Sequence, residues 1–229
     1  MFHVKTLKEK LDESLRLNSI NLSATEVDFL QRYIEQLLNF NKKINLISRK
    51  DEENIIERHI IPCLIFSILF KEFAGSVLDI GTGGGLPGIP FSIINRRSRI
   101  TLIDSINKKI SAVKEIVQSI RLDNVETIWT RVEDKEFIKK YSNYFDLIIS
   151  RATADLKTLI EYSKPLLRDS NSRLAVMKGG DILEREISDA KKRFNYIAIQ
   201  KIPLIYLPEN PENINQKFAV IVERINGRK

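Results

Sequence analysis

A glycine-rich stretch about a third of the way along the chain has the residue types and spacing of a small-molecule binding loop. Residues 77–90 read VLDIGTGGGLPGIP and contain five of the nine glycines in the 229-residue chain. A run of strand type precedes the glycines, and a helix-like segment follows them. Glycines allow positive φ and a close approach of backbone to ligand, and a helix start offers unpaired N–H groups. The stretch is therefore predicted to bind a phosphate, a dinucleotide or another nucleotide-like cofactor.

Three kinds of glycine loop compete for this stretch, and the residues after the glycines separate them. A phosphate-binding P-loop ends in Gly-Lys-Ser/Thr, whereas this loop ends in Gly-Leu-Pro. A dinucleotide fingerprint has its third glycine at the sixth position, where this chain has Leu86. Glycines at alternate positions, preceded by an acid, are typical of the first motif of doubly wound S-adenosylmethionine-dependent methyltransferases. That interpretation is favoured, and its candidate cofactor residues are Asp79, Gly81, Gly83 and Gly85.

Polar residues also follow the next two predicted strands, at the edge where parallel sheets bind ligands. Asp104 ends the run RITLID, and its carboxylate can accept hydrogen bonds from both hydroxyls of a ribose. The segment TRVE at 130–133 ends the following strand and can place a side chain or a backbone N–H beside an adenine. A lone Asp at a strand end more often caps a helix than binds a ligand. Three such features at successive strand ends favour a nucleoside site.

The fourth predicted strand and its turn, FDLIISRATA, bear on which atom is methylated. Enzymes acting on exocyclic amines usually carry an Asp/Asn-Pro-Pro-aromatic turn there, and this chain does not. Methylation of pyrimidine C5 needs a cysteine nucleophile, but the only cysteine, Cys63, lies in the helical region. Ribose methylation often uses a Lys-Asp-Lys-Glu set; Lys178 matches one member, but Ser150-Arg151 stands in place of the aspartate. An acceptor with no proton to remove remains, and guanine N7 is such an acceptor.

Arg151 is the candidate catalytic residue of this turn. Attack by N7 needs in-line placement, with reactants roughly 3–3.5 Å apart, more than it needs a general base. An arginine that paired with both N7 and O6 of guanine, the common arrangement, would block the nucleophile. Arg151 is therefore expected to contact O6 alone or a flanking phosphate, with a structural ion pair as the alternative.

The elements that must position these residues alternate between strands and helices after residue 75. Helices are expected between the strands, most clearly over residues 107–120. This alternation predicts an α/β fold with a doubly wound, mostly parallel, Rossmann-like methyltransferase sheet. Two later β-rich runs, joined by a loop at 206–218, predict an antiparallel excursion at the sheet edge. The β-rich runs are at 77–80, 99–103, 126–130, 145–149, 173–177, 196–202 and 218–224.

Residues 1–75 are expected to form an N-terminal helical cap, and residues 76–229 the S-adenosylmethionine-binding domain. Ser23 and Glu26 have the spacing of a capping box at the start of an amphipathic helix. The remaining elements of the cap are a charged turn and a buried apolar helix, at 41–54 and 55–70.

The composition is that of a soluble protein, with 43% hydrophobic and 29% charged residues. A single cysteine excludes an internal disulfide and fits a reducing compartment. The N-terminus lacks the apolar core of a signal peptide, and no apolar run is long enough to span a bilayer. The net charge of +7 slightly favours a polyanionic partner over a membrane. We therefore expect a cytoplasmic monomer that does not bind membranes.

Taken together, these motifs resemble one family, the bacterial small-subunit (16S) ribosomal RNA guanine-N7 methyltransferases, called RsmG or GidB. The similarity runs from about residue 25 to the end of the sheet, and the run GxGxGLPGIP is nearly diagnostic. The matching segments are NKKINLIS at 41–48, Arg58-His59-Ile60, DIGTGGGLPGIP at 79–90, Ile103-Asp104-Ser105, Arg131-Val132-Glu133, Ser150-Arg151-Ala152 and Met177-Lys178-Gly179.

The resemblance implies S-adenosylmethionine-dependent methylation of one guanine at N7, in a conserved loop of 16S ribosomal RNA near the decoding site. A loop target agrees with RNA geometry, because N7 faces the major groove of A-form RNA, which is too deep and narrow for side chains. The cofactor contacts implied by the resemblance are Gly81, Leu86, Asp104, Ser105, Ile106, Val132, Glu133 and Arg151.

The family pattern also makes His59 a second catalytic candidate, against the alternative of a packed, hydrogen-bonded core histidine. Asn41 is expected to bridge the cap to the glycine loop. Family members usually carry Asp-Ser where this chain has Pro62-Cys63, so any role of that acid is lost or moved. Basic residues near the expected pocket mouth are candidate RNA contacts: Lys42, Lys43, Arg49, Lys50, Arg58 and Lys178.

Two other classes of function stay open on the sequence. One is a non-catalytic RNA-binding or ribosome-assembly protein that keeps the cofactor fold, and the intact glycine loop with Asp104 argues against it. The other is a small-molecule N- or O-methyltransferase, which the net charge and the lack of an aromatic pocket signature disfavour. Naked RNA, an assembly intermediate and the finished subunit are all compatible with the sequence as substrates.

Overall fold

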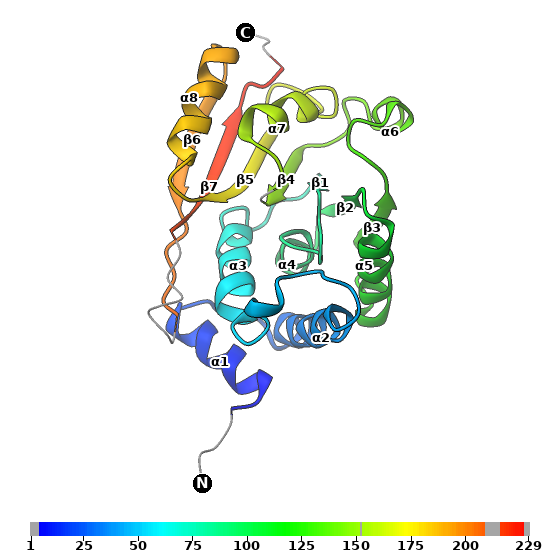
Figure 1. The fold of residues 1–229 in the computed structure, drawn as a ribbon, viewed down its shortest axis with the longest axis vertical. Helices are drawn as coiled ribbons and strands as arrows, with labels where there is room; N and C mark the ends of the chain where they lie inside the picture. The colour runs from blue at the N-terminus through cyan, green and yellow to red at the C-terminus, as the bar shows by residue number, and fades with distance from the viewer. Residues whose placement is uncertain (1–4, 152, 209–215, 227–229) are drawn as a thin grey trace.

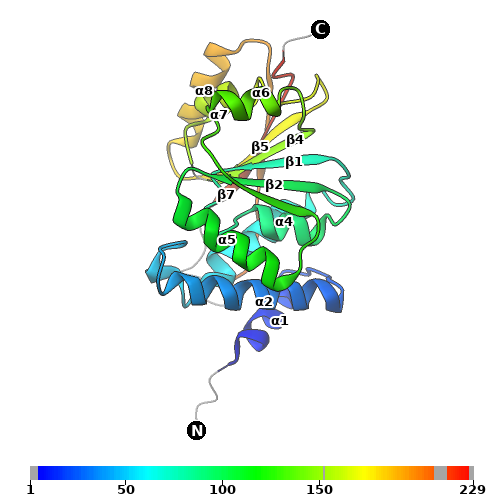
Figure 2. The ribbon, with the colours of Figure 1, turned by 90° about the vertical axis from the view of Figure 1, so that its right-hand side faces the viewer.

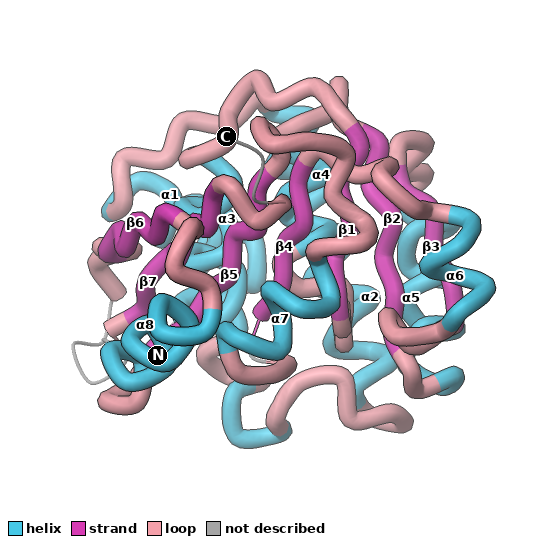
Figure 3. The backbone as a smooth tube through the Cα atoms, turned by 90° about the horizontal axis from the view of Figure 1, so that it is seen from above, coloured by secondary structure: helices cyan, strands magenta, loops and turns pink. Residues whose placement is uncertain are grey.

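The computed structural model describes residues 5–151, 153–208 and 216–226 around one seven-stranded sheet (Figure 1). The spatial order of the strands is β3-β2-β1-β4-β5-β7-β6 (Figure 3). The first five pair in parallel, whereas β7 runs antiparallel to both β5 and β6. In chain order the strands are β1 Ser76–Ile80, β2 Arg99–Asp104, β3 Val125–Trp129, β4 Leu147–Arg151, β5 Arg173–Gly179, β6 Ala198–Pro203 and β7 Lys217–Glu223.

This arrangement confirms the predicted doubly wound, mostly parallel sheet. The antiparallel excursion is confirmed as β7, which lies between β5 and β6 rather than at the edge itself. Of the loop predicted at 206–218, residues 209–215 lie outside the described part of the chain.

Helices lie on both faces of the sheet, as the edge-on view in Figure 2 shows. One face carries α6, α7 and α8, and the other carries α4 and α5, with α2 packed against these two from outside. In chain order the helices are α1 Leu7–Leu17, α2 Ala24–Asn41, α3 Ile61–Ile68, α4 Gly88–Ile94, α5 Asn107–Ile120, α6 Lys135–Lys140, α7 Leu156–Ser163 and α8 Leu183–Arg193, with short turns η1 Arg49–Asp51 and η2 Ile56–Ile60.

Each face of the sheet has its own hydrophobic core, because successive strand residues point to opposite sides. In β4, Leu147 and Ile149 join the core on the side of α2–α5, whereas Ile148 joins the core beneath α7 and α8. Residues of α2 such as Leu30 and Leu37 are buried in the same core as β1 and β2. The N-terminal helices and the sheet thus share one core, across the domain division predicted at residue 75.

The N-terminal helices begin where the sequence predicts but do not run without interruption. The Ser23–Glu26 capping box is present, with the Ser23 N–H donating to Glu26 and the Glu26 N–H to Ser23. The expected helix over 55–70 divides into the π-helical turn η2 and α3. Pro62 near the start of α3 has no N–H to donate, so the regular hydrogen-bond ladder changes there. No helix in the described part of the chain is long and apolar enough to cross a membrane.

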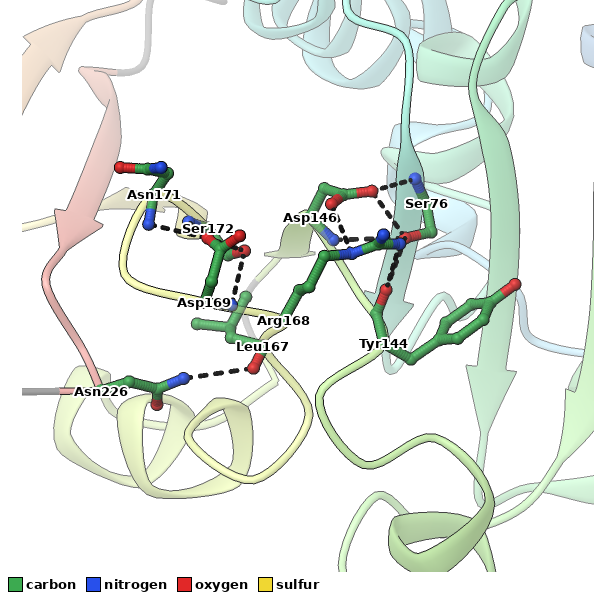
Figure 4. Close-up of polar contacts among 9 residues, drawn as sticks. All are labelled: Ser76, Tyr144, Asp146, Leu167, Arg168, Asp169, Asn171, Ser172 and Asn226. Carbon is green, nitrogen blue, oxygen red and sulfur yellow. Dashed lines mark hydrogen bonds and ion pairs between the residues drawn. The ribbon is translucent and has the colours of Figure 1, made fainter. Parts of the chain in front are cut away.

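The amino ends of β1 and β4 are joined by a group of polar contacts around Asp146 (Figure 4). One Asp146 oxygen accepts from the Ser76 N–H at 2.7 Å and from its hydroxyl at 2.8 Å. The other pairs with Arg168 Nε at 2.8 Å, and Arg168 also donates to the Tyr144 carbonyl at 3.0 Å. β4 itself begins at Leu147, two residues later than the predicted run 145–149.

Candidate active site

A cavity of ≈ 560 Å³ opens at the carboxyl ends of β1 to β4, the edge where open α/β sheets bind ligands. Its walls are the turns that follow these four strands, together with Leu46 and Ile47 from the segment before η1. The predicted site residues that line it are Gly81, Gly83, Leu86, Asp104, Ser105, Ile106, Val132, Glu133, Arg151 and His59.

The glycine loop needs its glycines for space as well as for backbone angles. Gly81 has a φ of +69°, and a Cβ there would lie 2.2 Å from the Thr153 Cγ2 atom. Gly83 has a φ of +57°, and a Cβ there would lie 4.0 Å from the Gly81 carbonyl oxygen. The Tyr33 hydroxyl of α2 donates to the Gly84 carbonyl at 2.9 Å, so an N-terminal helix supports the loop from behind. The result is a backbone surface that a ligand can approach closely.

Asp79 and Gly85 do not line the cavity, although both are predicted cofactor residues. One Asp79 oxygen accepts from the Thr82 hydroxyl at 2.7 Å and from the Gly88 N–H at 3.0 Å. Its other oxygen is buried without a hydrogen-bond partner. Burial raises the pKa of Asp79 to about 7, although the bonds from Thr82 and Gly88 lower it. The contacts of this carboxyl group shape the loop from inside.

Asp104 stands at the end of β2 and faces the cavity with a mostly buried carboxylate. Its Oδ2 accepts from the Gly83 N–H at 2.9 Å, and its Oδ1 accepts from the Ile106 N–H at 2.8 Å. Each oxygen keeps a lone pair beyond these bonds. Asp104 therefore ties two walls of the cavity together and still presents acceptors to a hydroxylated ligand.

Part of the cavity wall combines apolar surface with polar groups. Ile106, which is half exposed, and the buried Val132 provide apolar surface. Thr130 and Glu133 provide polar groups at the same place. Such a combination suits a heterocycle with hydrogen-bonding edges.

Arg151 and His59, the two predicted catalytic residues, are in direct contact. Arg151 Nη2 lies 2.5 Å from His59 Nδ1, and Arg151 Nη1 lies 3.6 Å from the Cys63 sulfur. The other ring nitrogen, His59 Nε2, lies 3.1 Å from Asp51 Oδ2. Asp51 Oδ1 in turn pairs with Arg58 Nη1 at 2.7 Å. Four side chains thus form a chain of polar contacts from the 49–60 segment to the end of β4.

His59 is neutral at physiological pH. Burial and then the charge of Arg151 lower its pKa to about 4, although the hydrogen bond to Asp51 raises it. Lys217 also contributes to the lowering, and burial brings the pKa of Lys217 itself down to about 8. The Lys217 ammonium donates to the Arg58 carbonyl at 2.5 Å. Two cationic side chains, Arg151 and Lys217, therefore act on one neutral imidazole.

A second cavity of ≈ 750 Å³ adjoins the first on the side of β5 and α8. The two cavities have Arg151, Thr153 and Ala154 in common. Lys178 lines the second cavity, but its ammonium donates to Glu186 and to the Ala154 carbonyl, both at 2.7 Å. Ala152, part of the predicted Ser-Arg-Ala turn, lies outside the described residues.

The charged segment after α2 is anchored by Asn41. The Asn41 side-chain oxygen accepts from the N–H groups of Leu46 at 2.8 Å and Ile47 at 2.9 Å, the two residues that line the first cavity. This confirms that Asn41 connects the N-terminal helices to the site, through these residues rather than through the glycine loop itself. The basic side chains that this segment exposes are Lys42, Lys43, Arg49 and Lys50.

A nucleoside-containing sulfonium cofactor fits this set of groups. The glycine loop leaves room where a side chain would clash, and Asp104 offers acceptors for ribose hydroxyls. Ile106 and Val132 provide apolar surface in the same cavity. The sequence model of the family described as "GidB: rRNA small subunit methyltransferase G" matches residues 26–213. The chain belongs to this family.

Relatives within the small-subunit methyltransferase G family match over most of their length. The ribosomal RNA small subunit methyltransferase G of Chlorobium luteolum is 36% identical over 191 residues, which cover 83% of this chain and 77% of that protein. The protein of the same name from Pelodictyon phaeoclathratiforme is 41% identical over 164 residues, or 71% and 69% of the two chains.

Solved structures share the fold of this methyltransferase G family member at low identity. A SAM-dependent methyltransferase from Aquifex aeolicus has a TM-score of 0.57 at 17% identity, covering 82% of this chain and 98% of that one. Fibrillarin from Aeropyrum pernix, in complex with natively bound S-adenosyl-L-methionine, has a TM-score of 0.51 at 13% identity, with coverages of 70% and 76%. The family and the fold together confirm an S-adenosylmethionine-dependent methyltransferase.

Sequence reasoning missed several groups of the site. In the sequence, Asp51 is one of several charged residues in the predicted turn, and no motif connects it to His59. No motif indicates a role for Lys217 either, and this residue reaches the site because β7 pairs with β5. Family members usually carry Asp-Ser where this chain has Pro62-Cys63, and here the Cys63 sulfur contacts Arg151. The acid that contacts His59 in this chain is Asp51.

Proposed function

We propose that this methyltransferase transfers a methyl group from S-adenosylmethionine to N7 of a guanine in a loop of 16S ribosomal RNA. The observation that carries the proposal is the wall that the two cavities share. It consists of a guanidinium, a hydroxyl and a methyl group, from Arg151, Thr153 and Ala154. Among the described residues, no carboxylate, amine or free imidazole is common to both cavities.

The first cavity is the proposed cofactor site. Gly81, Gly83 and Leu86 would face the amino-acid part of the cofactor, and Asp104 the ribose hydroxyls. Ser105, Ile106, Val132 and Glu133 would enclose the adenine. Bound there, the cofactor supplies an electrophilic methyl group. Asp79 and Gly85 would act indirectly, by fixing the shape of the loop.

The second cavity is the proposed acceptor site, and its chemistry favours a nucleophile that needs no deprotonation. The neighbouring imidazole, His59, has contacts at both ring nitrogens, and the nearby Lys178 is paired with Glu186. Guanine N7 carries a lone pair in the ring plane and no proton, so it can bond to the methyl carbon as the carbon–sulfur bond breaks. Arg151 would contact O6 or a flanking phosphate and so orient the base.

The proposed RNA contacts are the exposed basic residues beside the first cavity, Lys42, Lys43 and Arg49. Arg58 and Lys178, also candidates from the sequence, are engaged with Asp51 and with Glu186. For these two we propose positioning roles inside the site instead. The proposed partner is the small ribosomal subunit, and the proposed location is the cytoplasm. We also propose that the enzyme is a monomer, and light scattering after gel filtration tests this oligomeric state.

The decisive experiment is methylation of small subunits from a strain that lacks this enzyme, followed by borohydride–aniline cleavage. This chemistry cuts RNA at N7-methylguanine, so we expect one new cleavage site that depends on the enzyme and the cofactor. Methyl transfer from labelled cofactor without any cleavage would show that another atom is the acceptor.

A further inference from the structure

The contact between Arg151 and His59 shows which ring nitrogen of the imidazole carries the proton. A guanidinium stays protonated in proteins and only donates hydrogen bonds. Because Arg151 Nη2 lies 2.5 Å from His59 Nδ1, this nitrogen must be the acceptor. The single proton of the neutral ring is then on Nε2, which donates to Asp51 Oδ2 at 3.1 Å.

Asp51 is itself held in place, so it can impose this proton position on the ring. Its second oxygen pairs with Arg58 at 2.7 Å. Although partial burial raises it, hydrogen bonds with Arg58 and His59 lower the pKa of Asp51 overall, so the group is an anion near neutral pH. An ionised carboxylate only accepts hydrogen bonds, and it therefore selects the ring form that has its proton on Nε2.

We propose that Asp51 is a positioning residue for methyl transfer: it holds His59 as the Nε2–H tautomer, and His59 thereby fixes the Arg151 guanidinium at the wall between the two cavities. The tautomer is a property of the free protein, whereas its effect on turnover rests on the proposed function. The opposite tautomer would set an N–H of His59 against an N–H of Arg151 and push the guanidinium away.

The imidazole of His59 does not titrate near neutral pH, although burial lowers the pKa of the neighbouring Lys217 to about 8. The charged groups that act on His59 are Asp51 from η1, Arg151 from β4 and Lys217 from β7, while Arg58 pairs with Asp51 and Cys63 contacts Arg151. The pKa of His59 is about 4. We therefore expect no inflection from His59 in the pH dependence of kcat between pH 6 and 9.

The tautomer can be measured directly by nitrogen NMR of the histidine rings. The chain has two histidines, so the variant His3→Gln leaves His59 as the only ring signal. We expect the spectrum of a neutral ring with the proton on Nε2 in the wild-type site, and a mixture or the Nδ1–H form in Asp51→Asn. An Nδ1–H ring or a protonated ring at pH 7 in the parent protein would overturn the proposal.

A double-mutant cycle tests whether the effect of Asp51 passes through His59. In His59→Asn the side-chain oxygen can take the place of Nδ1 as acceptor, and no tautomer remains to be selected. We expect Asp51→Asn to lower kcat about tenfold in the wild-type background, the lower end of the range seen when a partner that orients a metal-binding histidine is removed. In the His59→Asn background, Asp51→Asn should change kcat by less than about twofold, which is the usual error when the effects of independent mutations are added. KM for the cofactor is measured alongside kcat, because His59 and Arg151 also line the cavity proposed for the cofactor.

The matched control is Asp146→Asn, which neutralises a carboxylate of similar exposure in an ion pair at the opposite end of the sheet. It should lower the melting temperature and leave kcat unchanged. An equal loss of kcat from Asp51→Asn in both backgrounds, or no loss in the wild type, would overturn the proposal. If the wild type itself does not methylate small subunits, the proposed function fails, while the NMR measurement still decides the tautomer.

Discussion

Strands β1 and β4 carry an aspartate network at each end, and the two networks differ in how completely their polar groups are paired. At the amino end, both oxygens of Asp146 have partners, in Ser76 and Arg168 (Figure 4). At the carboxyl end, one oxygen of the buried Asp79 has none, and its pKa is raised to about 7. Beside it the Arg151 guanidinium faces a neutral imidazole rather than a carboxylate.

This difference shows which end is arranged for stability and which for binding. Paired charges with satisfied hydrogen bonds join strands without exposing reactive groups. Groups with spare hydrogen-bonding capacity, buried charge and positive φ occur where a ligand completes the site. In this protein they collect at the carboxyl ends of the parallel strands, as expected for an open α/β sheet.

The largest expected effect comes from removing the buried charge of Asp79 with Asp79→Asn. The pKa is 3.8 in the unfolded reference and about 7 in the folded chain. Between these values the folded chain keeps a proton that the unfolded chain has released, so the free energy of unfolding falls as pH rises from 4 to 7. Three pKa units correspond to about 4 kcal/mol.

Urea unfolding at pH 4.5 and pH 8 checks this prediction. The wild type should lose stability relative to Asp79→Asn as pH rises, and the variant should be the more stable of the two at pH 8. Parallel pH dependences of the two proteins would mean that Asp79 is already ionised at low pH in the folded state.

The second-largest effect is expected from Asp104→Ala, which removes both carboxylate oxygens as hydrogen-bond acceptors. The Gly83 and Ile106 N–H groups lose their partner, and the proposed ribose contact is lost with them. We expect cofactor affinity to fall about a hundredfold, or roughly 3 kcal/mol, with the fold retained. Titration calorimetry with S-adenosylmethionine measures the change, and circular dichroism checks the fold. An unchanged affinity would rule out Asp104 as a cofactor contact.

At the opposite end of the sheet, Asp146→Asn should affect stability alone. It weakens the ion pair with Arg168 and one of the contacts to Ser76, at a cost of about 2 kcal/mol. Thermal unfolding should show a lower midpoint, while calorimetry gives the same cofactor affinity as the wild type. A loss of cofactor affinity in Asp146→Asn would contradict the proposal that this end of the sheet serves stability alone.

The smallest effect is expected at the surface, from the double variant Lys42→Gln, Lys43→Gln. Exposed lysines that contact phosphates contribute through counterion release, so RNA binding should weaken several-fold at low salt and depend less on salt, by about one unit of slope per contact. The matched control replaces Lys191 and Lys192 of α8, which are also exposed. Equal weakening by both pairs would indicate a general effect of net charge.

Residues whose place follows from local sequence were predicted well. Asp104 and the glycines occupy the ends of strands, and strand ends are fixed by hydrophobic patterns and turn residues. Because parallel strands end at one edge, the sequence alone predicts that the three motifs line a single cavity. Arg151 was found by the same logic, as the residue that ends β4.

The contacts of the site depend on packing that the sequence does not display. Asp51 in η1 contacts His59, which lies within the π-helical turn η2, and Lys217 comes from a strand inserted antiparallel beside β5. Asp79 was predicted to touch the cofactor because it precedes the glycines. In the structure its side chain turns inward to Thr82 and Gly88, and no local pattern distinguishes these two directions.

The packing of α2 against later elements has a consequence for how the chain is made. Leu30, Tyr33 and Leu37 are fully buried, and their cover comes in part from α4 and α5. A ribosome that adds about 5–20 residues per second needs roughly 4–16 s to proceed from the end of α2 to the end of α5. During that time the nascent chain carries an uncovered apolar helix face. Chains that stop before residue 120 keep that face exposed and are targets for chaperones and proteases.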